Sequence, residues 1–241
     1  MNAREMHYDF KQKLNKIDSL KYRNLLIPEI DWKLNEAQEV FVKMIIEPRV
    51  AQQIGFETSQ RTIEDVQSIV VDQNYKNGTC IKPTVYDDGQ YLVQLPADYW
   101  FHIKSTVLAT KGSCTLRPMQ TIKRQHDDLH EWSPFDRSSF LWKECNIGFN
   151  QDGIVIFNDD DFIPEWFCLS YLRIPKTIYN AQDFQGGQYR DLKGNLLTGS
   201  QDCELPEVVH REIVDIAVLI TTGDLQIPDY AIKMNKLKLT N

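Results

Sequence analysis

The stretch Ile27-Pro28-Glu29-Ile30 begins an apolar segment of helical period, and Leu205-Pro206-Glu207-Val208 begins a second one near the other end of the chain. Proline is tolerated in the first helical turn because its missing N–H needs no partner there, and glutamate favours the positive end of the helix dipole. Glu29–Ile46 repeats apolar side chains at helical spacing, and so does the segment from Pro206 to about Thr221. We predict that these two helices pack together with a shorter amphipathic helix over residues 2–15.

The middle of the chain changes from a helical to a strand-like pattern at about residue 79. Asp87-Asp88-Gly89 and Asn150-Gln151-Asp152-Gly153 separate runs of β-branched and aromatic residues, which is typical of hairpins. Short antiparallel strands at this spacing favour a small sandwich or barrel. The predicted class is therefore α+β, a helical bundle built from the N- and C-terminal helices with an inserted antiparallel β domain.

This pattern divides the chain into four parts. We expect a helical body from residues 1–75 and 204–228, an inserted β domain over 76–182, a Gly-rich loop over 183–203 and an extended C-terminal tail over 229–241. A structureless loop of that length is usually functional or ordered by a partner. The tail alternates apolar residues with lysines, so its apolar side needs a cover from elsewhere.

Composition excludes several classes of protein. The 241 residues carry a formal net charge of −7, whereas a dedicated nucleic-acid binder normally shows a basic patch. No uncharged apolar run is long enough to cross a membrane, and the charged N-terminus does not resemble a secretory signal. The 5 cysteines are odd in number and contain no CxxC pair, so we expect free thiols in a reducing cytosol.

Two polar clusters are candidates for metal binding, and we interpret both as solvated turns. His126 and His130 lie four residues apart, as in a zinc metalloprotease helix, but Asp127 stands where that chemistry needs a glutamate. The acidic run Asn158–Asp161 could offer oxygen ligands to calcium, but it lacks the EF-hand ligand order. Signatures of nucleotide binding and of a serine nucleophile are absent from the sequence. We therefore predict a protein that is not an enzyme and that has no catalytic, metal or cofactor site.

The predicted functional residues belong to an interface with another subunit or partner. They are apolar side chains of the two long helices and of the tail. They comprise Trp32, Leu34, Phe41, Val209, Ile213, Ile216, Ile220, Tyr230, Ile232, Met234, Leu237 and Leu239. The alternative is a carbohydrate- or host-receptor-binding β module, because the β region is rich in aromatic residues that could stack on sugars.

Short motifs in the same order along the chain resemble a known family. They are Ile27-Pro28-Glu29-Ile30-Asp31, Leu34-Asn35-Glu36-Ala37-Gln38, Phe41-Val42, Leu95-Pro96-Ala97-Asp98-Tyr99, Tyr171-Leu172-Arg173-Ile174-Pro175-Lys176, Leu205-Pro206-Glu207-Val208-Val209-His210 and Glu212-Ile213-Val214-Asp215. With them the chain resembles the head-to-tail connector (adaptor or ring) proteins of short-tailed bacteriophages, particularly of crAss-like phages.

The resemblance implies a non-enzymatic virion subunit that is made in the cytoplasm of the bacterial host. It implies a homo-oligomeric ring of about twelve copies at the head–tail junction, docked on the portal protein or on neighbouring ring and tail proteins. DNA would pass through such a ring without specific binding, and no membrane is involved. Residues 229–241 could then add a strand to a neighbouring chain.

Overall fold

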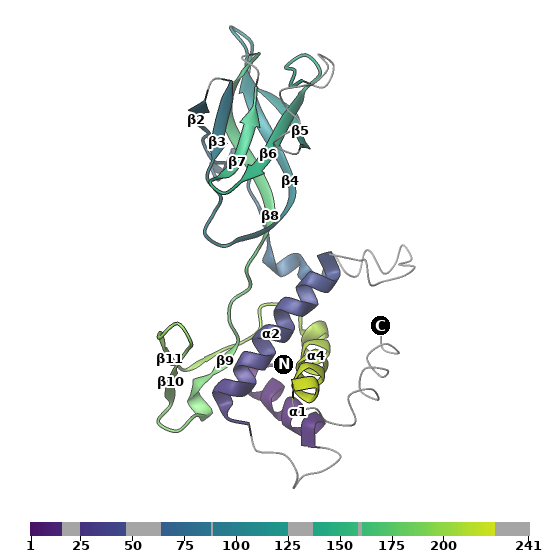
Figure 1. The fold of residues 1–241 in the computed structure, drawn as a ribbon, viewed down its shortest axis with the longest axis vertical. Coiled ribbons are helices and arrows are strands. Elements are labelled where there is room, and N and C mark those ends of the chain that lie inside the picture. Colours follow the sequence, from purple (N-terminus) through teal and green to yellow (C-terminus); the bar gives the residue numbers. More distant parts are fainter. Residues whose placement is uncertain (16–24, 47–63, 88, 125–136, 159–160, 225–241) are drawn as a thin grey trace, which may run out of the picture. The chain divides into compact units, whose positions relative to one another are not determined.

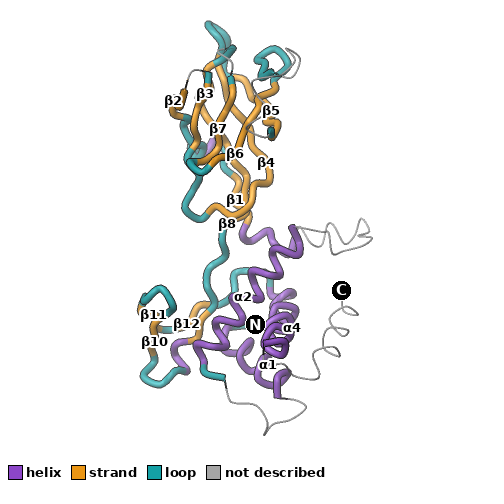
Figure 2. Tube along the Cα trace, viewed as in Figure 1, coloured by secondary structure: helices purple, strands orange, loops and turns teal. Residues whose placement is uncertain are grey.

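The computed structural model describes residues 1–15, 25–46, 64–87, 89–124, 137–158 and 161–224. The chain divides into two compact units. The first comprises residues 1–69 and 175–241, and the second comprises residues 70–174. The first unit holds the α-helices and the second holds a large sheet, as the colours of Figure 2 show.

The first unit is built on α1 (Ala3–Asn15), α2 (Ile27–Ile46) and α4 (His210–Asp224). A capping box begins α1, in which Asn2 Oδ1 accepts the Glu5 N–H at 2.8 Å and Glu5 Oε2 accepts the Asn2 N–H at 3.0 Å. Glu29 caps α2 by accepting the N–H of Leu26 at 2.7 Å. The Pro-Glu pair at 206–207 instead opens a 3₁₀ turn, Glu207–Val209, which leads into α4.

The stretch 183–203 differs from the long irregular loop that we expected. It contains β10 (Gln188–Arg190), β11 (Leu196–Thr198) and β12 (Ser200–Gln201). β10 pairs with β11, and β12 pairs with β9 (Tyr179–Asn180), so two small antiparallel sheets lie in the helical unit. These strands have two or three residues each, which is too short for alternation of apolar residues to reveal them.

The second unit is an eight-stranded sheet of order β1-β8-β4-β5-β6-β7-β3-β2 (Figure 1). Its inward side chains form one apolar core that includes Val107, Met119, Ile147, Ile156 and Phe167, all fully buried. The strands are β1 (Val70–Asp72), β2 (Thr84–Asp87), β3 (Gln90–Val93), β4 (Tyr99–Thr110), β5 (Arg117–Lys123), β6 (Glu144–Asn150), β7 (Gly153–Phe157) and β8 (Ile163–Arg173).

The hairpin predicted at Asn150–Gly153 is confirmed as the β6–β7 connection. Asn150 Oδ1 accepts the N–H groups of Asp152 at 3.0 Å and Gly153 at 2.9 Å, which is the role of asparagine in such turns. Gly153 has φ 146°, and a Cβ there would lie 2.2 Å from the carbonyl oxygen of Val93. Only glycine fits this close approach of two backbones.

The predicted fold class is wrong. The described residues form a mostly β protein around a curled, mixed eight-stranded sheet with few α-helices, and not a helical bundle that carries an antiparallel insert. The long helices have a clear apolar periodicity in the sequence, whereas short strands show only a weak one, so the β content was underestimated. The sheet is mixed because β5 and β6 run parallel, with Gln120 opposite Glu144. A parallel pair requires a long crossover, and the 20 residues between the end of β5 and the start of β6 leave room for one.

The cysteine prediction is wrong for two of the five residues, because Cys80 and Cys168 form a disulfide. Ile81 and Phe167 exchange both backbone hydrogen bonds at 2.8 Å, so the preceding Cys80 lies opposite Cys168 in a non-hydrogen-bonded position. Cα atoms in such pairs are about 4.5 Å apart, and the observed separation is 4.5 Å. The bond joins the segment before β2 to β8.

Candidate interface surfaces

The structure places the predicted interface residues of the helices partly inside the protein. Trp32 is 53% exposed and Ile220 is partly exposed, so both are available to a second protein. Buried within the chain are Leu34, Phe41, Val209, Ile213 and Ile216. Outside the described residues lie Tyr230, Ile232, Met234, Leu237 and Leu239 of the tail, together with the metal candidates His126, His130, Asp159 and Asp160.

A buried polar cluster occupies the centre of the helical unit. Asp31 Oδ1 lies 2.7 Å from His7 Nε2, and both side chains are about 5% exposed or less. Its other oxygen accepts the hydroxyl of Tyr189 at 2.6 Å and the N–H of Asn180 at 3.2 Å. Burial, helped by the hydrogen bond to Asp31, raises the pKa of the Tyr189 phenol. The cluster therefore ties α1, α2 and the small sheets together through one carboxylate.

Asn35 and Gln38 extend this polar face along α2, since they follow Asp31 by one and two helical turns. Asn35 Nδ2 donates to the carbonyl of Ile178 at 2.8 Å, and Asn35 Oδ1 accepts the Ile178 N–H at 2.7 Å. Gln38 donates to the carbonyl of Lys176 at 3.3 Å. The polar motif residues of α2 therefore hold the chain segment that returns to the helical unit.

The second Pro-Glu segment contacts the beginning of the chain. The Met1 ammonium lies 2.7 Å from Glu207 Oε1, and this contact lowers the pKa of Glu207. The ring nitrogens of His210 lie 2.9 Å from the Met1 carbonyl oxygen and 2.8 Å from that of Leu205. These contacts fix the position of α1 against the start of α4.

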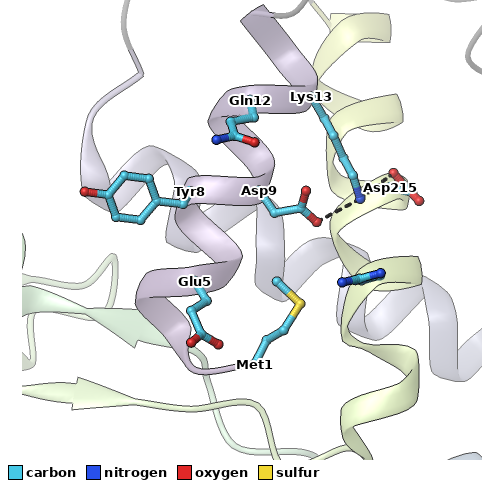
Figure 3. Close-up of a pocket in the computed structure, with 8 residues that line it drawn as sticks. Met1, Glu5, Tyr8, Asp9, Gln12, Lys13 and Asp215 are labelled. Atoms are coloured by element: carbon cyan, nitrogen blue, oxygen red, sulfur yellow. Dashed lines mark ion pairs between the residues drawn. The ribbon is translucent and has the colours of Figure 1, made fainter.

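A surface pocket of about 580 Å³ lies along α1 and the facing side of α4 (Figure 3). Lys13 reaches across it and pairs with Asp9 at 2.8 Å and with Asp215 at 2.9 Å, the interactions that Figure 3 marks. Its lining is Met1, Glu5, Tyr8, Asp9, Gln12, Lys13, Arg211 and Asp215. The pocket thus combines the large side chains of Met1 and Tyr8 with charged side chains of both signs.

Among the described residues of the second unit, the most exposed aromatic side chain was not predicted as a site residue. Leu141 and Trp142 lie at the tip of a turn before β6 and are 77% and 75% exposed. In the sequence they stand beside Phe140, which is buried, and nothing in the pattern distinguishes the three. The sequence therefore contains no signal that could have identified Leu141 and Trp142 as exposed.

The described residues offer little for catalysis. His102 Nε2 lies 3.0 Å from Ser105 Oγ, which in turn contacts Thr121, but His102 Nδ1 is buried without a described partner to orient it. Burial, with the nearby charge of Lys123, lowers the pKa of His102 to about 4. Burial raises the pKa of the Cys145 thiol, and it raises the pKa of the Cys203 thiol to about 11. Both thiols are therefore protonated at neutral pH. Within the described ranges, no three His, Cys, Asp or Glu side chains group as metal ligands.

Comparison with known proteins finds a full-length similarity to a phage protein. The chain is 24% identical to "Ring protein 4/5" of Bacteroides phage crAss001 over 241 aligned positions, which cover 94% of this chain and 96% of the phage protein. No family model matches the chain. Among the described helices, none is long and apolar enough to cross a membrane.

Proposed function

We propose that this chain is a non-enzymatic structural subunit of a homo-oligomeric ring in a phage virion. The observation that carries the proposal is the end-to-end similarity to a phage ring protein, which covers nearly the whole of both chains. An alignment of this extent includes both units and not one shared module. We place the ring at the head–tail junction, docked on the portal protein or on an adjacent ring, with about twelve copies around the DNA.

The charge of the chain supports a channel through which DNA passes without specific binding. A net charge of −7 gives the chain no overall attraction for the phosphate backbone, which is compatible with DNA that passes without specific binding. Among the described residues, Trp32 and Ile220 are at least partly exposed and therefore available for assembly. The tail 229–241 lies outside the described residues, and the place of all these residues in an interface stays a prediction.

Native mass spectrometry of the purified chain tests the proposal. We expect a ring of defined copy number, or a stable complex when the portal protein encoded by the same phage is added. A chain that stays monomeric at high concentration and binds no portal contradicts the proposal.

Deletion of residues 229–241 tests whether the tail contributes to assembly. We expect the truncated chain to keep its circular dichroism spectrum and melting temperature and to assemble less, because an apolar strand-like tail is suited to pairing with another chain. Replacing Lys233, Lys236 and Lys238 with glutamine in the full-length chain is the matched control for lost charge. Loss of folding on truncation would show that the tail belongs to the core.

The alternative, a carbohydrate- or host-receptor-binding β module, rests on the exposed aromatic side chains of the second unit, Tyr86 and Trp142. Screening the same protein against a glycan array separates the two functions. A monomer with glycan affinity that depends on Trp142 favours the receptor-binding module.

A further inference from the structure

One short stretch of the second unit, residues 70–87, contains both end strands of the large sheet. β1 pairs with β8 at one end of the strand order, and β2 pairs with β3 at the other. Between β1 and β2, the backbone of Ile81 pairs with that of Phe167 on β8. We call residues 70–87 the seam, because they join the two ends of the strand order.

The described backbone hydrogen bonds that hold the middle of the seam to β8 are few. The Gln73 N–H donates to the Leu169 carbonyl at 3.0 Å, and Ile81 and Phe167 exchange both backbone bonds at 2.8 Å. Residues 74–79, between these points, are exposed or half-buried. Segments with few buried contacts are the parts of a protein that open locally. The disulfide to β8 therefore decides how firmly the middle of the seam is held.

The disulfide lies on the outer face of the sheet. Phe167 and Leu169, the neighbours of Cys168 on β8, are fully buried in the apolar core. Successive side chains of a strand point to opposite faces, so Cys168 points outward, and it is partly exposed. Its partner Cys80 is 7% exposed. Exposed disulfides are the labile and regulatory ones. A reagent in solution can therefore reach this bond at Cys168 while the core stays folded.

The other three cysteines have no such partner. Cys145 and Cys203 are buried, and burial raises the pKa of both thiols, so they are poor nucleophiles at neutral pH. Cys114 is exposed and free. All five cysteines lie in the described residues, and Cys80–Cys168 is the bonded pair among them. Oxidation within the chain therefore acts on this pair alone.

The fold brings the two thiols together before any bond forms. Their Cα atoms lie 4.5 Å apart, which is the spacing of antiparallel neighbours in a non-hydrogen-bonded position. The backbone pairing of Ile81 with Phe167 supports this position without the disulfide. Groups that are held side by side react at a high effective concentration. The folded chain can therefore form the bond as soon as an oxidant is present.

The surroundings of the chain decide which state of the pair persists. On the proposed function, on which this inference rests, the chain is made in the bacterial cytoplasm and leaves the cell in the virion. Cytosolic reductants keep protein thiols reduced, whereas disulfides persist in oxidising surroundings outside the cell. The state of the pair should therefore change when the virion is released.

We propose that Cys80 and Cys168 are a redox-controlled lock of the seam, open as two thiols in the producing cell and closed as a disulfide in the released virion. The oxidant is a small-molecule disulfide. One cysteine thiolate attacks it and releases one small thiolate, and the second cysteine thiolate then attacks the mixed disulfide and releases the other. Two protein thiols are oxidised, the small disulfide is reduced to two thiols, and the two cysteine protons pass to these leaving groups.

Thiol trapping at two stages of infection tests the lock. Infected cells and released virions are each precipitated with acid and redissolved in denaturant with N-ethylmaleimide, and the remaining disulfides are then reduced and labelled with iodoacetamide. Peptide mass spectrometry reads the label at each cysteine. We expect Cys80 and Cys168 to carry the first label in cells and the second label in virions. Cys114, an exposed free thiol, is the internal control and should carry the first label in both.

The outcomes of trapping separate the lock from the proposed function. A pair that is already oxidised in the cells, or that is still reduced in the virions, overturns the lock and leaves the structural role of the chain standing. A chain that is absent from the virions overturns the lock and the proposed function together.

Hydrogen exchange of the purified chain tests what the bond does to the seam. We expect amides of residues 73–83 to exchange at least about tenfold faster in the reduced wild type than in the oxidised one, and those of β6 and β7 to change less. Cys80→Ser/Cys168→Ser should exchange as the reduced wild type does under both conditions, and Cys114→Ser should follow the wild type. Equal exchange of residues 73–83 in the two redox states of the wild type overturns the lock.

Discussion

The helical unit and the β unit of this chain are stabilised by different kinds of interaction. In the helical unit a buried hydrogen bond between His7 and Asp31 forms the centre of a polar cluster that holds distant chain segments in place. In the β unit the core is a continuous set of apolar side chains, reinforced by the Cys80–Cys168 disulfide. The stability of a buried polar cluster depends on the identity of each of its residues, because each one supplies a particular hydrogen bond. An apolar core tolerates the replacement of one apolar residue by another of similar volume. A single conservative substitution should therefore destabilise the helical unit more than the β unit.

Removing the Asp31 carboxylate should break the helical unit and leave the β unit intact. Asp31→Ala leaves the His7 ring, the Tyr189 hydroxyl and the Asn180 N–H without their acceptor in a buried site. Leaving a buried hydrogen-bonding group without its partner costs about 1–3 kcal/mol for each group, and three groups lose theirs here. We expect hydrogen exchange, resolved by peptide, to rise in α1 and α2 and to stay unchanged in β4–β8.

An exposed ion pair on the same helix gives the control. Glu39 and Lys43 lie 3.6 Å apart on α2, with more than half of each side chain exposed. Glu39→Ala should cost less than about 1 kcal/mol, since water screens such pairs. Equal effects of the two substitutions would contradict the central role of Asp31.

Local signals made parts of this fold predictable. The β6–β7 hairpin follows from Asn150 and Gly153, whose side-chain acceptor and unusual φ act within four residues of sequence. The start of α2 follows from Pro28 and Glu29 in the same way. The parallel pairing of β5 with β6 and the opposition of Cys80 to Cys168 depend on residues that are far apart in sequence, and no short pattern encodes them.

The candidate site was harder to predict for a related reason. A helical apolar stripe shows which side chains avoid water but not what covers them, so Leu34 and Ile213 were predicted at an interface and lie inside the chain. The exposure of Trp142 follows from the conformation of its turn, which depends on Asp161 and Arg117 from other strands and loops. Surface features of this kind become visible only once the tertiary contacts are known.

Removing the disulfide should weaken the β unit alone, by a smaller amount. Cys80→Ser with Cys168→Ser frees a loop with a sequence separation of 88 residues, and such bonds typically contribute about 2–4 kcal/mol. Urea denaturation should show this loss for the double variant, and a reducing agent should bring the wild type to the same level. Cys114→Ser, at an exposed free thiol, is the matched control and should change neither result.

A still smaller effect should appear in acid and should again be confined to the β unit. The pKa of His102 is lowered from 6.5 to about 4, first by burial and then by the charge of Lys123. Between pH 6.5 and about pH 4 the unfolded chain binds a proton at this histidine that the folded chain does not. The free energy of unfolding therefore decreases as the pH is lowered from 6.5 to about 4, and this contribution is constant below that. The shift corresponds to at most about 3 kcal/mol, and water around the half-buried ring reduces it.

His102→Gln isolates this contribution from the carboxylates that titrate in the same range. Glutamine does not ionise and can still hydrogen-bond to Ser105, so the difference in stability between wild type and variant should change between pH 6.5 and about pH 4 and be constant outside that window. All other side chains are the same in the wild type and in the variant, so their contributions cancel in this difference. A difference that is flat with pH would contradict the assigned burial of His102. A difference that appears in the exchange of α1 or α2 would mean that the two units do not respond independently, and the contrast between them would then have to be abandoned.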